Sequence, residues 1–469
     1  RAASVICIIL FLEIGTKFLY YSENNTDTML KPVLFFLSIF LVCSCAQQQE
    51  PEVAINPETY WGENPWPDIR KKRISQLLPQ ALKTADVDCW MTICRENNND
   101  PIADHIGGEN AGGTAVFLFY NDATGFHSKV FSPSGEATAL YDLDIHEEVV
   151  SVERGTSAIE QASDFIKTKD FKSIAVNTSS KNVMADGLTH TQYEEIATAL
   201  GNETSKLVSS EEVVYEWLSI KLPEEVAILK KAAKLTAQWQ IEAYEQVVPG
   251  TSTDADIAKY LKQRMTEYGV TDGWAPAQNP NVNSGPDRGH SHATDKVIMP
   301  GDVIQIDFGI KVYDRWVTDI QRFAYVLKEG ESEAPDEIMH YWESSKAGNR
   351  AALAAMQPGV KGVDVDRAQR ILMQKAGSDY VMWSTGHPVG YVAHDVGPNL
   401  GGSQASHVRP ASEKVIKEGM TFAFDGFHSW KLADGGVKTM SVEEMAVVTE
   451  NGAEYVIAPQ EELVIISNK

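Results

Sequence analysis

Short apolar runs alternate with stretches of helical spacing between residue 73 and about residue 220. The apolar runs, which have the length and composition of strands, are residues 87–94, 113–121 and 172–179. The stretches with helical spacing are residues 157–168 and 190–201. Because strands and helices alternate along the chain, the pattern predicts an α/β domain in which helices and a sheet form three layers.

A long helix is predicted to begin next, at the segment KLPEE of residues 221–225. Its proline lacks an N–H group that would have no partner in a first turn, and its two glutamates suit the positive end of the helix dipole. A chain of 469 residues is also too long for one ordinary core. We therefore predict a first domain over residues 73–222 and a second over residues 223–469.

The second domain contains an internal repeat. Residues 247–269 and 356–377 each pass from Pro-Gly through a capping segment into an amphipathic helix that ends at glycine. Further on, two alternating strands each follow a glycine turn and carry an aspartate six residues after that glycine, Asp307 and Asp425. A half-fold that is used twice would place these aspartates in related positions on facing strands. Like charges in one interior are costly unless cations neutralise them.

A second carboxylate pair is predicted where the first of these strands turns back. After Asp307 the chain turns near Asp314 and returns through Asp319, so a hairpin can bring Asp307 and Asp319 side by side on one face. Two adjacent carboxylates would raise one pKa strongly unless a metal holds both of them ionised. Further titratable candidates follow along the chain: His387, His394, Asp425, Glu443 and Glu444. Carboxylates with one imidazole suit Mn²⁺, Co²⁺, Fe²⁺ or Zn²⁺.

With these motifs the chain resembles the pita-bread metallopeptidases, the family of Xaa-Pro aminopeptidase, prolidase, methionine aminopeptidase and creatinase. The resemblance is strong over residues 225–460 and weaker over residues 73–220. It implies an α/β, creatinase-like N-terminal domain. It also implies an α+β pita-bread catalytic domain with an internal pseudo-two-fold repeat.

The family's ligand order, Asp, Asp, His, Glu, Glu, can be carried over position by position. Within IDFG and TDIQR, Asp307 and Asp319 match the first two ligands, and the glycine-flanked His387 matches the third. Glu443 matches the last ligand, and the resemblance also gives it a catalytic role as an acceptor of the proton from water. Two histidines match substrate-side positions: His394, and His290 with His292 as a near rival.

Three positions depart from the family pattern. Asp425 stands where the fourth ligand is usually glutamate, so its carboxylate is one methylene shorter. Pro388 follows the ligand histidine in place of glycine, and Ser441 replaces an arginine often found before the last glutamate. These changes bear on substrate positioning and on the occupancy of one metal site.

The resemblance implies a hydrolase that uses two divalent metal ions, Mn²⁺ foremost and Co²⁺, Zn²⁺ or Fe²⁺ as alternatives. Its expected substrates are short proline-containing peptides, and a homodimer is expected at the family level. The sequence does not separate prolidase from aminopeptidase P. Two alternatives stay open: a metal-independent, creatinase-like hydrolase, and a binding protein that has kept the fold without the chemistry.

Composition excludes one class of partner. Aspartate and glutamate outnumber lysine and arginine by 65 to 41, which gives a net charge of −24 that repels nucleic acid.

Two of the five cysteines, Cys89 and Cys94, lie five residues apart in one predicted strand and hence on opposite faces. We expect them to be buried thiols and not a disulfide.

The first part of the chain has the pattern of an export signal. After Met29, which we take as the start, an apolar run of about ten residues at 33–42 is too short to span a bilayer. The ending Val42-Cys43-Ser44-Cys45 resembles a bacterial lipobox with Cys45 as the lipidated residue. We therefore expect residues 1–44 to be a leader and residues 45–72 a linker. The folded part would be an anchored lipoprotein facing the periplasm or cell exterior; an uncleaved membrane anchor is the alternative.

Replacing the predicted lipidation site tests this expectation. Cys45→Ala should move the protein from the membrane fraction to the soluble fraction, because the acyl chains would have no attachment point. Cell fractionation with immunoblotting measures the shift, with Cys89→Ala as the control. An unchanged distribution of Cys45→Ala would contradict lipidation.

Overall fold

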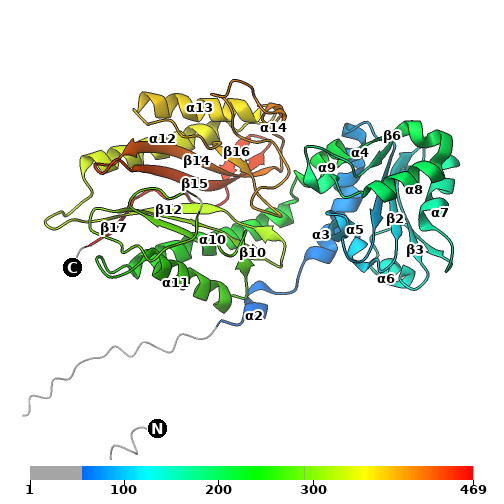
Figure 1. Cartoon of the computed structure of the whole chain (residues 1–469), viewed down its shortest axis with the longest axis horizontal. Helices are drawn as coiled ribbons and strands as arrows, with labels where there is room; N and C mark the ends of the chain where they lie inside the picture. The colour runs from blue at the N-terminus through cyan, green and yellow to red at the C-terminus, as the bar shows by residue number, and fades with distance from the viewer. Residues whose placement is uncertain (1–54, 290, 468–469) are drawn as a thin grey trace, which may run out of the picture. The chain divides into compact units, whose positions relative to one another are not determined.

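The computed structural model describes residues 55–289 and 291–467 (Figure 1). The predicted leader, Cys45, the first part of the predicted linker and His290 lie outside the described residues. Among the described residues, no helix has the length and apolar character that crossing a membrane requires. The described residues belong to one compact unit.

The N-terminal part is built on a six-stranded mixed sheet with the order β4-β3-β2-β1-β5-β6. Its strands are β1 Cys89–Cys94, β2 Ala115–Asp122, β3 Gly125–Pro133, β4 Glu148–Val152, β5 Ile174–Val176 and β6 Leu207–Ser209. Helices α7 (Ala158–Lys167) and α8 (His190–Leu200) pack on one face. Helices α4 (Leu78–Thr84) and α9 (Glu211–Leu218) pack on the other. The predicted three-layer α/β arrangement is confirmed.

The two cysteines of β1 lie as the alternation of the strand requires. Cys89 belongs to the core beneath α7 and α8, and Cys94 to the core on the opposite face. Both are buried free thiols, as predicted.

Helices occupy much of the stretch whose composition predicts a linker. Helix α2 covers Pro57–Trp61 and α3 covers Trp66–Lys72, and each has proline in its first turn. Trp66 is buried and packs edge-on against Trp316 and Tyr391, and its apolar contacts outweigh the polar composition around it. The chain from residue 57 onward is therefore folded, whereas the predicted domain limits stay a prediction.

The C-terminal part contains two four-stranded sheets and a small three-stranded one. The first has the order β17-β12-β9-β8, the second β13-β14-β15-β16 and the small one β11-β10-β7. The strands are β7 Thr271–Asp272, β8 Asn281–Ser284, β9 Val303–Phe308, β10 Ile310–Val312, β11 Trp316–Val317, β12 Ile320–Val326, β13 Gly386–Pro388, β14 Thr421–Lys431, β15 Val437–Thr449, β16 Gly452–Tyr455 and β17 Val464–Ile466.

Helices cover the outer sides of these sheets, and their order reveals the repeat. Helices α10 (Pro223–Glu245) and α11 (Asp254–Glu267) run along one side of the strands. Helices α12 (Asp336–Ala355) and α13 (Gly362–Lys375) run along the other (Figure 1). In each half, two helices are followed further along the chain by a strand that carries an aspartate, β9 in the first half and β14 in the second. The predicted α+β pita-bread arrangement with its internal repeat is confirmed.

A glycine fixes the approach of α12 to β14 next to a predicted ligand. A Cβ at Gly426 would lie 1.9 Å from the Ser345 carbonyl oxygen, so only glycine fits there. The Ser345 hydroxyl donates to the carbonyl oxygens of Gly426 and Met440, and the Asn349 amide donates to those of Phe424 and Val442. Helix α12 is therefore anchored to the strands β14 and β15 on either side of Asp425.

The start of α10 carries a completely buried ion pair. Arg73 Nη1 lies 2.7 Å from Glu225 Oε2, and both side chains have no exposed surface. Arg73 also donates to the carbonyl oxygens of Trp217 and Ile220. Glu225 accepts hydrogen bonds from the Trp316 indole and the Tyr391 hydroxyl. Through these hydrogen bonds the pair joins the segment before α4 to the loop after β13.

Breaking this pair should be far more damaging than breaking its exposed neighbour. Arg73→Met leaves the Glu225 carboxylate buried without its cation, and we expect a loss of about 3–5 kcal/mol in the free energy of unfolding. Lys72→Met removes the adjacent Lys72–Glu224 pair, which is 45% exposed on both sides, and should cost about 1 kcal/mol or less. Urea denaturation compares the two. Equal losses would contradict the role of the buried pair.

Candidate metal centre

The predicted ligands converge on one face of the two larger sheets. Asp425 of β14 lies directly opposite Glu443 of β15, so their side chains share a face. His387 of β13 pairs with Ala423, two residues from Asp425, and therefore points to the same side. Asp307 of β9 lies opposite Gln321 of β12, and Asp319 comes two residues before Gln321.

Three of these side chains stand at metal-ligand spacing. Asp319, His387 and Glu443 each offer one ligand atom, and these atoms lie within 4.8 Å of one another. His387 Nε2 is 3.8 Å from Asp319 Oδ2 and 3.9 Å from Glu443 Oε1. These distances are too long for hydrogen bonds, but they leave room for a cation between the atoms.

The carboxylates are buried and repel one another. Burial raises the pKa of Asp319 well above its ordinary value, and the Glu443 and Asp307 carboxylates raise it further. The pKa of Asp425 is raised in the same way, with Arg370 opposing the shift. Burial and Asp307 also raise the pKa of Glu443. The site is therefore unfavourable for several ionised carboxylates unless a positive charge lies among them.

An unsatisfied oxygen supports the same conclusion. Glu443 Oε2 is buried and has no hydrogen-bond partner among the described residues. A buried carboxylate oxygen in that state is costly, and a cation would satisfy it. Carboxylate oxygens with one imidazole form a donor set suited to first-row divalent metals. The residues present therefore fit a metal centre.

His394 lies beside His387, with the ring centroids 4.3 Å apart, and its own side chain is exposed. The loop that carries it is held by its neighbour Asp395, which accepts a hydrogen bond from the Tyr391 amide. Asp395 also lies 3.2 Å from the buried Lys221 ammonium. His292, the alternative to His290 as a substrate-side histidine, is exposed.

Sequence reasoning did not single out Arg370 of α13, which lies close enough to Asp425 to lower its pKa. Its guanidinium donates to Asp366 and to the carbonyl oxygens of Val381 and Trp383. Arg370 thereby holds the segment that leads into His387. The sequence signal for Arg370 was its spacing of four residues from Asp366, which places the two side chains on one face of the same helix.

Glu444, the other acid of the Glu-Glu pair, is not part of the cluster. Its carboxylate forms two hydrogen bonds with the Arg322 guanidinium and accepts another from the Gln460 amide. All three groups are buried. Glu444 therefore stabilises the fold behind the site.

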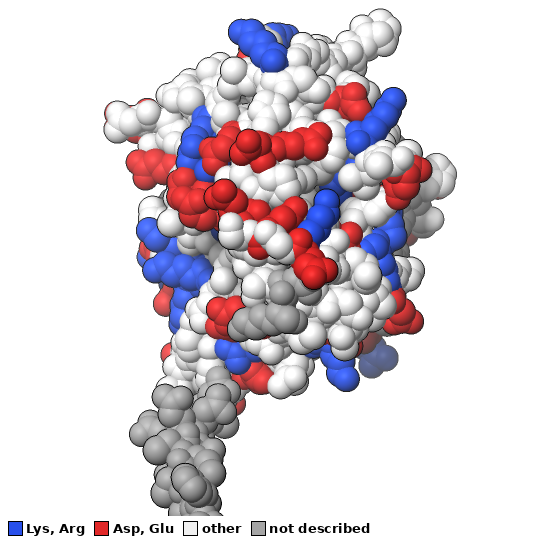
Figure 2. Space-filling model, turned by 90° about the vertical axis from the view of Figure 1, so that its left-hand side faces the viewer, with Lys and Arg blue, Asp and Glu red and all other residues white. Residues whose placement is uncertain are grey.

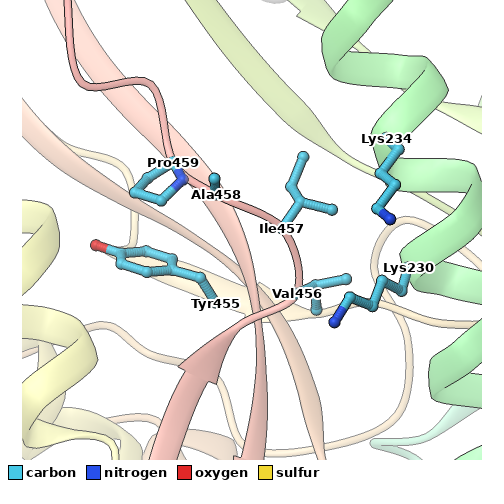
Figure 3. Close-up of a pocket in the computed structure, with 7 residues that line it drawn as sticks. All are labelled: Lys230, Lys234, Tyr455, Val456, Ile457, Ala458 and Pro459. Atoms are coloured by element: carbon cyan, nitrogen blue, oxygen red, sulfur yellow. The ribbon is translucent and has the colours of Figure 1, made fainter.

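On the face drawn in Figure 2, acidic side chains gather across the middle of the surface and basic side chains lie mainly around them. A hollow of about 520 Å³ lies between α10 and the turn after β16 (Figure 3). Lys230, Lys234 and residues 455–459 line it, and none of the predicted ligands does. The predicted ligands thus lie outside this hollow.

Comparison with known proteins identifies the C-terminal part. Residues 227–450 match the model of metallopeptidase family M24. The C-terminal part of the chain is an M24 metallopeptidase domain. The chain is 25% identical over 333 residues to an Xaa-Pro dipeptidase of Pyrococcus furiosus, a match that covers 70% of this chain and 87% of the relative. It is 22% identical over 386 residues to the Xaa-Pro aminopeptidase of Escherichia coli, covering 76% and 84%.

Solved structures have the same fold as this chain. An X-Pro aminopeptidase from Thermotoga maritima superposes with a TM-score of 0.62 at 20% identity, over 82% of this chain and 100% of that one. A prolidase from Pyrococcus horikoshii gives a TM-score of 0.58 at 18% identity, over 84% and 100%. Both likenesses extend beyond the M24 match into the N-terminal α/β part.

The raised pKa values predict how the metal-free protein responds to pH. Protonated carboxyls favour the folded state, so their contribution is complete below the unfolded pKa of about 4 and is lost as pH rises towards the folded values. Asp319→Asn removes one charge. At pH 8 the metal-free variant should be more stable than metal-free wild type by about 1 kcal/mol or more.

This difference should shrink towards pH 5, and urea denaturation after chelation measures it at both pH values. Glu329→Gln, which changes an exposed acid three residues beyond β12, is the control and should show no such pH dependence. A metal-free Asp319→Asn variant that is less stable than wild type at pH 8 would refute the mutual repulsion of the carboxylates.

Proposed function

We propose that this M24 metallopeptidase hydrolyses a peptide bond next to proline in short peptides, as an Xaa-Pro dipeptidase or an Xaa-Pro aminopeptidase. The observation that carries the proposal is the convergence of Asp319, His387 and Glu443 at metal-ligand spacing. It is supported by the relatives from P. furiosus and E. coli, whose names give Xaa-Pro dipeptidase and Xaa-Pro aminopeptidase.

Five residues would hold two divalent metal ions in this proposal: Asp307, Asp319, His387, Asp425 and Glu443. Mn²⁺ is the metal that we expect first, with Co²⁺, Zn²⁺ or Fe²⁺ as alternatives. When bound, the two ions would polarise the peptide carbonyl and make water nucleophilic near neutral pH. The cluster carries four carboxylates, so two divalent ions would balance its charge.

The residues of the chain have separate tasks in the proposed reaction. Glu443 accepts the proton that leaves the attacking water, because its carboxylate is buried and has an oxygen without a hydrogen-bond partner among the described residues. His394 reaches the site from the exposed side and is placed to donate a proton to the departing nitrogen. The second substrate-side histidine of the proposal is His290.

The proposal includes a place of action. The pattern that ends at Cys45 favours export and a lipid anchor, so the substrates would be peptides outside the cytoplasm. We also propose that the chain forms a homodimer.

Metal removal and replacement test the proposed activity. The purified protein should lose hydrolysis of Xaa-Pro dipeptides and Xaa-Pro-Yaa tripeptides after chelation, and regain it with Mn²⁺, Co²⁺ or Zn²⁺. The preferred peptide length then separates dipeptidase from aminopeptidase. Glu443→Gln should lower kcat/KM by about 10²-fold or more, the order typical of a lost general base. Glu454→Gln, which changes an exposed acid on the neighbouring strand β16, should leave it unchanged.

Two outcomes would replace the proposal. Hydrolysis that survives complete chelation would favour a metal-independent, creatinase-like reaction. Absence of hydrolysis with every metal would favour a binding protein that keeps the M24 fold, with Asp425 and Pro388 as signs of a degenerate site.

A further inference from the structure

Three uncharged polar side chains lie directly beside the carboxylate cluster. Gln321 of β12 stands opposite Asp307, and Gln305 lies two residues before Asp307 on the same face of β9. Ser441 lies two residues before Glu443 on the same face of β15. Gln321 is 5% exposed and Ser441 is 7% exposed. Polar groups in so buried a position must form hydrogen bonds to be tolerated.

These three side chains hold one amide in a single orientation. Gln321 Oε1 accepts a hydrogen bond of 2.6 Å from Gln305 Nε2 and another of 2.6 Å from the Ser441 hydroxyl. Gln305 Nε2 also lies 3.3 Å from Ser441 Oγ, which closes the triangle. An amide oxygen has two lone pairs, and both are now in use. The reverse orientation would turn the Gln321 NH₂ group towards the Gln305 NH₂ group, which is also a donor.

In this orientation Gln305 and Ser441 bond only the oxygen of the Gln321 amide, so its NH₂ group points away from both of them. Because Ser441 and Glu443 lie two residues apart on one face of β15, the Gln321 amide that Ser441 holds lies beside the Glu443 carboxylate. Glu443 Oε2 is buried and has no hydrogen-bond partner among the described residues. Glu443 therefore has a buried amide beside it and one oxygen that a cation would satisfy.

We propose that Gln321, oriented by Gln305 and Ser441, is a positioning residue that aims the Glu443 carboxylate at the metal centre. A donor behind a metal-ligating carboxylate fixes its rotamer and stabilises its charged form. The inference rests on the metal centre of the proposed function. It extends that function by three residues that neither bind metal nor contact the reacting peptide bond.

The internal repeat gives this assignment an independent argument. The strands that carry Asp307 and Asp425 are equivalent, so their partners across the sheet, Gln321 and Glu443, are equivalent too. By the same register, Asp319 is equivalent to Ser441. Each half thus contributes one carboxylate at one of these two positions and an uncharged group at the other. The uncharged groups are the two that hydrogen-bond to each other.

The test measures metal binding and not only activity. Gln321→Met keeps an unbranched side chain of similar length but removes the donor, and it should weaken the binding of one of two Mn²⁺ ions by about 10- to 100-fold. Ser441→Ala removes one of the two donors that orient the amide and should have a smaller effect in the same direction. Competition with a chelating dye measures both dissociation constants. The visible absorption spectrum of the Co²⁺-loaded protein reports the ligand geometry.

Ser429→Ala is the matched control. Ser429 lies on β14 on the same face, is 3% exposed and hydrogen-bonds Thr439, but has no contact with Gln321. It should keep the wild-type metal affinities and Co²⁺ spectrum. Metal-free Gln321→Met should unfold at a lower temperature than wild type, because Gln305 and Ser441 lose a buried partner, so the metal dissociation constants are compared at a temperature at which every variant is folded.

The outcomes separate this inference from the proposed function. Wild type that binds neither metal would refute the metal centre itself. Wild type that binds two metals, together with a Gln321→Met variant of unchanged affinities, would overturn only the role of Gln321. If Gln321→Met does not fold, Ser441→Ala decides, and unchanged affinities and Co²⁺ spectrum in that variant would overturn the inference.

Discussion

The concentration of negative charge where the two larger sheets meet is the constraint on which the rest of the structure depends. Asp319, Asp425 and Glu443 are almost fully buried, and burial together with neighbouring carboxylates raises the pKa of all three. Burial of even one unpaired carboxylate is costly. The fold can keep the cluster in place only because rigid elements surround it. The approach of α12 to Gly426 and the guanidinium of Arg370 beside Asp425 are two such supports.

The supports differ in kind on the two faces of the central strands. Behind the cluster, Arg322 and Glu444 form a buried ion pair with two hydrogen bonds, which stabilises the strands without adding net charge. On the face of the cluster, the adjacent residues Gln321 and Ser441 are uncharged. A further carboxylate at either position would increase the repulsion, and a cation would compete for the ligands. An amide and a hydroxyl can orient a carboxylate without either effect.

Much of this arrangement follows from the sequence, because it depends on local spacing. The alternating strands after Gly301 and Gly419 predicted that Asp307 and Asp425 point inwards, and the repeated helices predicted the symmetry between the halves. The roles of Gln321 and Arg370 could not be predicted in this way. Gln321 depends on Ser441, which lies 120 residues away along the chain. Arg370 holds the segment before His387 through backbone carbonyl groups, which carry no sequence signal. Helix α3 was missed because one buried tryptophan, Trp66, outweighs a polar composition.

The shorter side chain of Asp425 is best understood through the repeat. In the family pattern a glutamate stands at this position, whereas here the two halves carry the same residue, Asp307 and Asp425, at equivalent places. Asp425 lies directly opposite Glu443, and its amide donates a hydrogen bond of 2.7 Å to the Thr385 carbonyl oxygen beside β13. The strand that carries Asp425 is thus bonded to the strands that carry Glu443 and His387. Because these three predicted ligands lie on adjacent hydrogen-bonded strands, the backbone sets their spacing, and a carboxylate one methylene shorter at position 425 keeps its place on the face that it shares with Glu443.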